Sequence, residues 1–438
     1  MSAGICVMNR NAIAMAADSA VTVGDHIAIH NSANKLFSLS QLAPVGAIVY
    51  ADSTFMSIPV EIIIKEYKRA AGRKTLCSLK DYLNDFIIYL ENNGSYFRFN
   101  LNEKTYVKNV FLKLMNGLNG NYTKYLEEAR ARKGSDLTDD ERACIRKKVL
   151  NDTVEFIQSQ ANLDRTALAE YVKGKYKSFF VDLLTSNHEF KWLNFESIES
   201  FVEEICTIFD KKFERNGYVG LAIAGYGDDE IYPSLCHIHL YGVINGKVSY
   251  SIEQEASICE ETTAYIIPLA QVDVMQTFIF GVNDQLLGYL AQEISQQIAE
   301  CLEAIDDGLF AIGKKSAVMA QLMGITGNIL NHMQEVAARN YLAPIIDSVA
   351  TLPIEELGLL AESMINITSI RRRVALDSNI GTVGGPIDVS IISKSDGFIW
   401  LKRKHYFESK YNPQYFYSHY LIRSEGEPDE SFMGVAIE

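Results

Sequence analysis

The sequence predicts an α+β protein in which two stacked antiparallel sheets are flanked by helices. Three observations lead to this class. Near both ends of the chain apolar residues alternate with others, which indicates strands. The dipeptides Asn245-Gly246 and Asp396-Gly397 are typical of tight turns between antiparallel strands. Between residues 72 and 215 the apolar residues instead recur at helical spacing.

The N-terminal segment is expected to form paired strands. Alternation over residues 5–17, around a polar break at 9–11, predicts a β-hairpin that ends in Asp18. A second hairpin-like unit follows at 21–37, and then an apolar strand at 45–52. These strands would form the first part of the core.

Capping signals mark the next helices. Residues 53–73 are predicted to be helical, with Pro59 in the first turn and Ser57 nearby as a cap, because an interior proline would cost about 3 kcal/mol. Ser78 is expected to open a helix whose apolar face consists of Leu79, Tyr82, Leu83, Phe86, Ile87 and Leu90. Thr138 begins a capping-box pattern ahead of a further helix.

The second half of the chain returns to strands and adds more helices. Strands are expected at 218–225, 235–242, 247–252, 387–393 and 398–407. Helices are expected after a cap at Asn283 or Asp284, over 317–341 and over 355–373. The Arg371-Arg372-Arg373 run at the end of the last helix suits the helix dipole, and we expect it to be solvated.

These patterns divide the chain into four parts. We expect residues 1–71 and 216–405 to form the core, 72–215 to be a mostly helical insertion, about 306–345 to add helices to the core, and 406–438 to be a tail. The insertion could act as a lid, a gate or a docking surface, or it could only stabilise the core. The dense aromatic residues of the tail suggest that it docks on the body or on a neighbour.

Ser2 is the first candidate for chemistry. Initiator methionine is usually removed before a small residue, so the mature chain is expected to begin at Ser2. Its α-amine, with an ordinary pKa near ~8, could then serve as general base for its own hydroxyl. An N-terminal serine alone is common, so the residues that follow decide the case.

Those residues resemble a known family. Ala16-Ala17-Asp18, the segments IHNSANKLF at 29–37 and GAIVYADSTFMS at 46–57, and the late glycine pair at 384–385 occur in the order found in proteasome β-subunits and HslV-type peptidases. The resemblance covers 2–70 and 350–405 well and 217–305 loosely. It implies an N-terminal nucleophile hydrolase with a four-layer αββα sandwich.

The resemblance also assigns roles to four residues. Ser2 falls where the family has its nucleophile, usually threonine, and Asp18 matches the acidic residue of the second strand. Lys35 matches the lysine beside the nucleophile, whose charge favours the alkoxide. Ala51 falls where the family has a glycine whose backbone N–H stabilises the oxyanion, a role that needs no particular side chain. Asp18 and Lys35 could instead be an ordinary ion pair that braces two strands.

Two departures weaken this catalytic assignment. Serine in place of threonine loses the β-branch that fixes the hydroxyl rotamer. Before the late glycine pair the family often has an aspartate and a serine, whereas this chain has Ile380 and Val383 at those places. Thr382 or Asp377 could substitute.

Composition limits the compartment and the partners. The formal charge of −14 argues against nucleic acid, because phosphate binding requires concentrated lysine and arginine. Seven scattered cysteines indicate reduced thiols in a cytoplasm. We expect no signal peptide, no membrane span and no cofactor. Strand alternation places His237 and His239 on one face and Cys236 on the other, so no metal site is expected.

The function predicted from the sequence is cleavage of peptide or amide bonds through an acyl-ester on Ser2. Two alternatives remain open: an inactive scaffold or sensor, and an amidase that acts on small molecules. The family resemblance implies a homo-oligomer, such as a ring, that acts on peptide or protein substrates with an ATP-dependent unfoldase. The large insertion is equally compatible with a smaller homo-oligomer.

Overall fold

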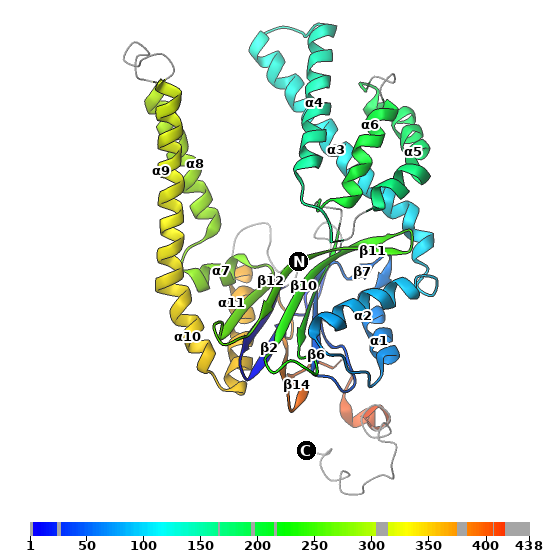
Figure 1. Ribbon diagram of the computed structural model, residues 1–438, viewed down its shortest axis with the longest axis vertical. Coiled ribbons are helices and arrows are strands. Elements are labelled where there is room, and N and C mark those ends of the chain that lie inside the picture. The colour runs from blue at the N-terminus through cyan, green and yellow to red at the C-terminus, as the bar shows by residue number, and fades with distance from the viewer. Residues whose placement is uncertain are drawn as a thin grey trace, which may run out of the picture.

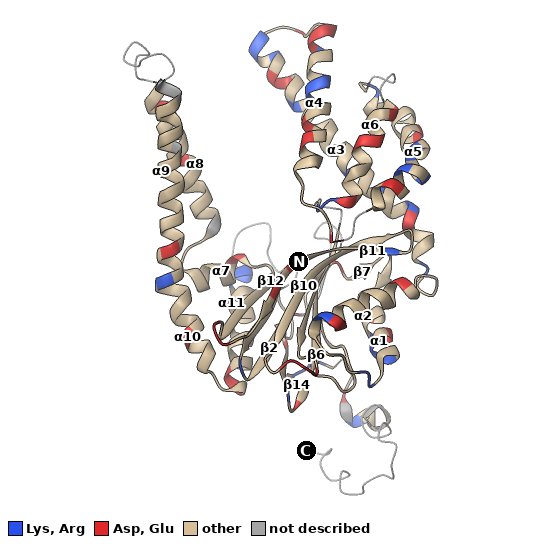
Figure 2. Ribbon diagram, viewed as in Figure 1, with Lys and Arg blue, Asp and Glu red and all other residues tan. Residues whose placement is uncertain are grey.

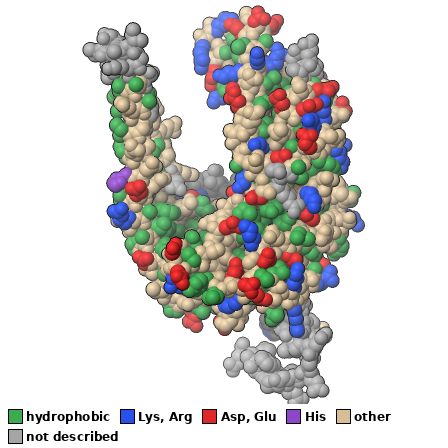
Figure 3. All heavy atoms as spheres, in the orientation of Figure 1, with side chains coloured by type: hydrophobic (Ala, Val, Ile, Leu, Met, Phe, Trp, Pro, Cys, Tyr) green, Lys and Arg blue, Asp and Glu red, His purple; other side chains and the backbone are tan. Residues whose placement is uncertain are grey.

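The computed structural model describes residues 3–23, 28–164, 167–193, 198–213, 217–303, 314–374, 383–405 and 407–416. Two five-stranded antiparallel sheets lie at the centre of this part of the chain. Two helical arms project from the same end of the sheets (Figure 1). The space-filling view shows the surface hollowed between the arms (Figure 3).

The first sheet joins strands from the two ends of the chain. Its order is β12-β1-β2-β13-β14, and the strands span Ala264–Ala270, Ala3–Asn9, Ala12–Ala17, Asp388–Ser393 and Gly397–Lys402. The predicted β1–β2 hairpin is confirmed, with Ile5 opposite Ala16. The predicted turn at Asp396-Gly397 is confirmed as well, because β13 and β14 pair across it. The N-terminal strand β1 is therefore an interior strand of this sheet, with β12 on one side and β2 on the other.

The second sheet has the order β11-β10-β9-β6-β5. Its strands span Lys247–Ser257, Ser234–Ile244, Val219–Gly225, Val45–Ala51 and Leu36–Ser38. Asn245 and Gly246 both have positive φ, at 52° and 68°, as the predicted tight turn between β10 and β11 requires. Two short hairpins lie outside the sheets, and they pair Val21–Val23 (β3) with Ala28–His30 (β4) and Thr54–Phe55 (β7) with Ile58–Pro59 (β8).

The two sheets share an apolar core, and each carries helices on its other face. Met15 and Ile392 of the first sheet lie in one buried cluster with Ile48 and Ala222 of the second. Against the first sheet pack α7, α10 and α11, which span Asp273–Phe280, Ala343–Thr351 and Ile354–Val374. Against the second sheet pack α1 and α2, which span Val60–Ala71 and Leu79–Asn92.

The start of α1 differs from the expectation, whereas the start of α2 agrees with it. Helix α1 begins only at Val60, Pro59 is its N-cap, and no side chain caps it. Residues 54–59 form the β7–β8 hairpin instead, and Ser57 lies in its turn with φ of 69°. Ser78 caps α2 in a reciprocal capping box with Asp81. The six predicted apolar residues of α2 are all buried.

One arm is formed by the helices that follow α2. They are α3 Phe99–Lys133, α4 Asp139–Ser159, α5 Leu168–Ser186, α6 Ile198–Ile205 and the 3-10 turns His188–Phe190 (η1) and Cys206–Asp210 (η3). Thr138 and Glu141 form the predicted capping box of α4. The arm has an apolar cluster of its own, in which Phe111 and Phe180 stack at a centroid distance of 3.9 Å.

The other arm is a hairpin of two helices, α8 Asp284–Glu303 and α9 Lys314–Ala337, and a π-helical turn over Ala338–Leu342 joins it to α10. Asn283 accepts a hydrogen bond from the Leu286 amide at 3.2 Å, which confirms one of the two predicted caps. The described chain ends in short turns, η6 Ser409–Tyr411 and α12 Pro413–Phe416. Among the helices described, none combines the length and the apolar character needed to cross a membrane.

Candidate active site

Asp18 follows β2 and lies beside the first described residue of β1. Its carboxylate is buried and accepts four hydrogen bonds. Oδ1 receives the Ala3 amide at 2.9 Å and Lys35 Nζ at 2.5 Å. Oδ2 receives the amides of Ala20 at 3.2 Å and Gly384 at 3.1 Å. A buried carboxylate needs such partners, and these partners fix its position relative to the N-terminal strand.

Lys35 precedes β5 and places its ammonium on that carboxylate. The residue is 4% exposed, and Nζ donates to Asp18 Oδ1 and to the Ala20 carbonyl, both at 2.5 Å. Burial lowers the pKa of Lys35, while the charge and hydrogen bond of Asp18 oppose that shift. The structure therefore brings two of the four predicted site residues into direct contact.

Ala51 is the last residue of β6, and it adopts a backbone conformation that is unusual for its type. Its φ of 64° lies in the left-handed region, which costs about 1–2 kcal/mol in a residue with a Cβ. The next amide, that of Asp52, donates to the Tyr218 carbonyl at 3.1 Å and so is already engaged. Strained backbone of this kind occurs often at functional sites.

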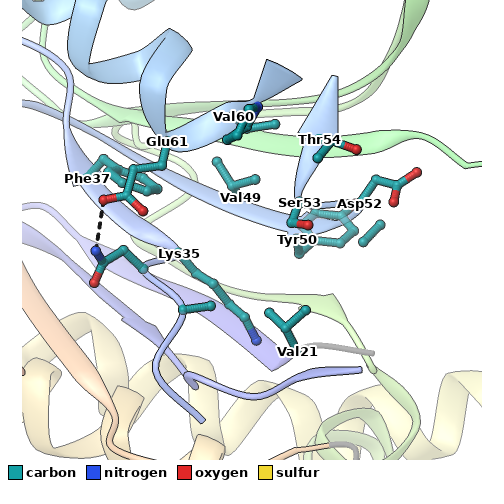
Figure 4. A pocket seen from close by; sticks show the side chains of 14 residues that line it. Val21, Lys35, Phe37, Val49, Tyr50, Asp52, Ser53, Thr54, Val60 and Glu61 are labelled. Atoms are coloured by element: carbon teal, nitrogen blue, oxygen red, sulfur yellow. Dashed lines mark hydrogen bonds between the residues drawn. The ribbon is translucent and has the colours of Figure 1, made fainter. Parts of the chain in front are cut away.

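A cavity of about 210 Å³ joins Lys35 to Ala51. Figure 4 shows Lys35 extending along one side of it toward Val21. Apolar side chains form much of the wall, with Phe37, Val49 and Val60 among them. Glu61 lies at the rim, where it accepts from Asn34 Nδ2 at 2.9 Å and from Lys65 Nζ at 2.6 Å.

Several predicted residues lie outside the described part of the chain. Ser2 precedes Ala3 and is one of them. Thr382 and Asp377, the suggested substitutes in the late turn, and Ile380 are others. Val383 is described and buried at 1% exposure. The structure thus gives the geometry of Asp18, Lys35 and Ala51, whereas the role of Ser2 remains a prediction.

The late turn supports Asp18 through its backbone, which sequence reasoning did not foresee. In addition to the bond from Gly384 to Asp18, the Ser19 amide donates to the Gly384 carbonyl at 3.1 Å. The Ser19 hydroxyl donates to the Pro386 carbonyl at 2.5 Å. A hydrogen bond from a backbone amide depends on no particular side chain, so only the glycine pair at 384–385 could have indicated this contact in the sequence.

A second cluster of titratable groups joins Tyr50 of β6 to two histidines of β10. The Tyr50 hydroxyl is hydrogen-bonded to Nε2 of His237 and, at 2.9 Å, to Nε2 of His239, which confirms that both histidines share one face. Burial lowers the pKa of His237 to about 4, so the ring is neutral at pH 7. Glu253 lies 3.8 Å from His239 Nδ1. Within the described residues, no group of three or more histidine, cysteine or acidic side chains could hold a metal ion.

No protein-family model matches the chain, and a comparison with curated proteins gives no match either. Solved structures do match. "Anbu (ancestral beta-subunit) from Yersinia bercovieri" is 9% identical over 92% of this chain and 88% of that chain, with a TM-score of 0.25. The structure "Helical Assembly of the Anbu Complex from Pseudomonas aeruginosa" is 9% identical over 98% and 99%, at 0.26. The Anbu Gly-1 mutant from Hyphomicrobium sp. strain MC1 is 10% identical over 95% and 93%, at 0.25.

These neighbours correct the family expected from the sequence. Assignment to proteasome β-subunits and HslV-type peptidases is wrong, because the matching structures are Anbu proteins, a different proteasome-like family of N-terminal nucleophile type. An ATP-dependent unfoldase was expected as a partner only because of that family assignment, so this expectation has no remaining support. At TM-scores of 0.25 and 0.26 the likeness carries no weight for the chemistry, which has to be argued from the site itself.

Proposed function

We propose that this chain is an N-terminal nucleophile hydrolase that cleaves amide bonds through Ser2. The observation that carries the proposal is the buried ion pair of Asp18 and Lys35, which is hydrogen-bonded to Ala3 and opens on a cavity. The Ala3 amide and Lys35 Nζ donate to the same oxygen of Asp18, at 2.9 and 2.5 Å, so the described start of the chain lies beside the cation.

In the proposed mechanism, loss of Met1 frees the Ser2 amine. The amine takes the proton from the Ser2 hydroxyl, directly or through one water, and Lys35 stabilises the developing negative charge. Asp18 holds the ammonium in place. Across the cavity, the backbone N–H of Ala51 donates a hydrogen bond to the oxyanion that forms on the substrate carbonyl. The Ser2 oxygen bonds to the carbonyl carbon of the substrate, the Ser2 ammonium gives its proton to the substrate nitrogen, and the C–N bond breaks to leave an acyl-ester on Ser2. Water then attacks the ester carbonyl, which releases the acid and restores the Ser2 hydroxyl.

The cavity beside Lys35 indicates which side chain the substrate presents before the cleaved bond. Its volume of about 210 Å³ and its apolar wall, with Val21, Phe37 and Val49, fit a small or medium aliphatic group. Among the described lining residues, the charged side chains are those of Lys35, Asp52 and Glu61. Glu61 already accepts hydrogen bonds from Asn34 and Lys65. We therefore propose a preference for valine- or leucine-like residues.

The proposal extends to the architecture. Helices on the outer face of each sheet support the four-layer αββα sandwich of N-terminal nucleophile hydrolases. The division of the chain at 71/72 and 215/216, and the use of the α3–α6 arm as a lid, gate or docking surface, belong to the same proposal. That arm meets the second sheet at Gly242, where the ring of Tyr106 from α3 packs on the glycine.

We propose further that the chain assembles with copies of itself through the α8–α9 arm. Seven large apolar side chains are exposed there: Leu286, Tyr289, Leu290, Ile325, Ile329, Met333 and Val336. Few charged residues mark this arm in Figure 2, so repulsion between two copies of the arm is small despite the net charge of −14. Light scattering should show an oligomer for the wild type and a smaller mass for Ile325→Ser/Ile329→Ser. An unchanged mass in the folded variant would remove the arm from the interface.

The mechanism is tested by trapping. The protein is incubated with a β-lactone, which acylates N-terminal nucleophiles, and the adduct is located by mass spectrometry. We expect Met1 to be absent and the adduct to lie on Ser2. Ser2→Ala should lose the adduct, whereas Ser135→Ala, a change at an exposed serine of the helical arm, should keep it. An intact Met1, or labelling that survives Ser2→Ala, would overturn the mechanism.

One observation favours the inactive alternative. All four hydrogen bonds to Asp18 come from backbone amides and Lys35, which also suits a brace that only joins the strands. In that case Ser2→Ala and wild type should behave alike in every substrate panel. A panel that compares peptides with small amides separates the peptidase from an amidase that acts on small molecules.

A further inference from the structure

A second and larger cavity lies at the end of β12, away from the cavity beside Lys35. Its volume is about 910 Å³, within the range of ligand pockets, and it is lined by the turn after β12, by α7 and by the C-terminal end of α11. Polar groups are prominent in its wall, among them Asn283 and Gln285.

Strand register places this cavity next to the N-terminal residue. Ala270, the last residue of β12, pairs with Ala3 and also lines the cavity. Asp18 lies on the other side of Ala3, because β2 pairs with the opposite edge of β1. The first strand therefore runs between two cavities. The one beside Lys35 and Ala51 suits the acyl half of a substrate, and the one beside Ala270 suits the half that leaves.

The charges of this cavity come from α11 and α7. Arg372 donates to both carboxylate oxygens of Asp273, at 2.6 and 2.7 Å, and its side chain is only 12% exposed. The expectation of a solvated arginine run is therefore wrong for Arg372. Its Nε is buried without a hydrogen-bond partner in the described structure. Arg371 also lines the cavity, is exposed, and forms no ion pair with any described residue.

The wall thus holds two guanidinium groups and one carboxylate. Asp273 neutralises Arg372 and holds it rigid, so the positive charge that remains belongs to Arg371. A guanidinium presents a planar fork that matches a carboxylate in two parallel hydrogen bonds. Around it, the Asn283 side chain donates to Thr277 Oγ1 at 3.2 Å, and Thr277 donates to the Asp273 carbonyl at 2.6 Å, so the polar wall is already ordered.

We propose that this cavity binds the leaving half of the substrate, and that Arg371 selects a carboxylate there. The inference rests on the proposed hydrolase function and names its substrate class: peptides with an acidic group just beyond the cleaved bond. The carboxylate is either an aspartate or glutamate side chain or the free C-terminus of a short leaving peptide. A carboxylate that pairs with Arg371 would hold the leaving peptide at the end of β12, where Ala270 pairs with Ala3.

Binding is measured on the full-length Ser2→Ala protein, which holds peptides without cleaving them. Fluorescence polarisation compares a labelled peptide that carries glutamate after a central leucine with the same peptide carrying glutamine. A second pair ends in a free carboxylate or an amide just after that position. We expect about tenfold tighter binding of the charged member of one pair, as a charge-assisted hydrogen bond gives. The pair that responds identifies the source of the carboxylate.

Substitutions then assign the effect to Arg371. In Arg371→Gln the preference should vanish, and in Arg371→Glu it should turn toward a peptide with lysine at that position. Arg132→Gln is the matched control, because Arg132 is exposed on α3 and, among the described residues, forms an ion pair with Glu128 alone. Thermal melting confirms that each variant folds. Equal binding of charged and neutral peptides, or a preference that survives Arg371→Gln, would overturn the proposal.

The two proposals fail separately. If Ser2 takes no adduct but Ser2→Ala binds acidic peptides through Arg371, the subsite stands and the hydrolase does not. If Ser2 is acylated and peptides are cut without regard to charge, the hydrolase stands and the subsite is wrong. Inorganic phosphate is included as a competitor, and displacement of peptide by phosphate at low concentration would show a general anion site instead.

Discussion

At the scale of single residues, the site depends on how charge is buried. Asp18 is 1% exposed and Lys35 is 4% exposed, yet Asp18 accepts four hydrogen bonds and Lys35 donates two. Such a pair contributes less net stability than its distance of 2.5 Å suggests, because both ions lose water. Removing one partner is a different matter, since it leaves the other ion buried and unpaired.

Lys35→Met is therefore expected to destabilise the protein strongly. The remaining amide donors cannot replace the cation, so the free energy of unfolding should fall by about 3–5 kcal/mol, measured by urea denaturation. Lys65→Met provides the control, because the Lys65 side chain is 63% exposed and its pair with Glu61 should contribute less than about 1 kcal/mol. Similar small losses in both variants would show that Asp18 is not held by the ion pair.

His237 makes stability depend on pH. Burial lowers its pKa in the folded protein to about 4 from the ordinary 6.5. Between those values the unfolded chain takes up a proton that the folded protein does not bind, so stability falls as the pH falls. From pH 7 to pH 5 the loss should be about 1–2 kcal/mol in urea unfolding. His237→Gln, which keeps an acceptor for Tyr50, should flatten this part of the profile, and an unchanged slope would contradict the assignment.

At the scale of elements, the α3–α6 arm is anchored to the second sheet by one buried carboxylate. Glu103 of α3 is 5% exposed and accepts from Tyr176 Oη at 2.6 Å, from Lys175 Nζ at 2.9 Å and from the Asn245 amide at 2.8 Å. Hydrogen bonds from these donors lower the pKa of Glu103 against the effect of desolvation, which raises it. Two helices and the β10–β11 turn thus meet at this carboxylate.

Glu103→Gln should weaken that junction. The amide brings two hydrogens toward groups that already donate, so at least one buried donor loses its partner, at about 1–3 kcal/mol. Urea unfolding measures the loss, and limited proteolysis should show faster cleavage within the arm than within the sheets. Glu127→Gln, at an exposed position of the same helix, should behave like the wild type. If both variants resist proteolysis equally, the arm is anchored elsewhere.

At the scale of the whole molecule, the two sheets are held at close approach by glycine. A Cβ on Gly46 of β6 would lie 2.8 Å from the Phe398 ring, 2.9 Å from Ile392 Cδ1 and 3.1 Å from Met15 Sδ. All three neighbours belong to the first sheet, so Gly46 sets the spacing between sheets. Close-packed interiors accept such added volume only by shifting side chains or backbone.

Gly46→Ala should therefore lower stability, although alanine usually suits a folded chain better than glycine. We expect a loss of about 1–3 kcal/mol from overpacking, read as a lower urea midpoint. Gly117→Ala is the opposite control: it lies in α3 with open space around its Cβ position, and it should gain up to about 1 kcal/mol. A stable Gly46→Ala protein would show that the sheets can separate freely.

The local features of the protein can be predicted from its sequence alone. The capping boxes at Ser78 and Thr138, the turn at Asn245-Gly246 and the apolar face of α2 follow from neighbouring residues, and the structure confirms each of them. Where two local signals competed, the prediction failed: the expected helix over 53–73 begins only at Val60, because the preceding residues form a hairpin.

The pairings that build the site, in contrast, arise from the packing of the whole chain. Ala3 meets Ala270, and the Gly384 amide meets Asp18, across separations that no periodicity records. The same holds for Arg372, which local reasoning placed in solvent and the fold binds to Asp273. The physical reason is that turns, caps and amphipathic faces are set by short-range sterics and spacing, whereas strand partners and buried charge pairs are chosen by the packing of the whole chain.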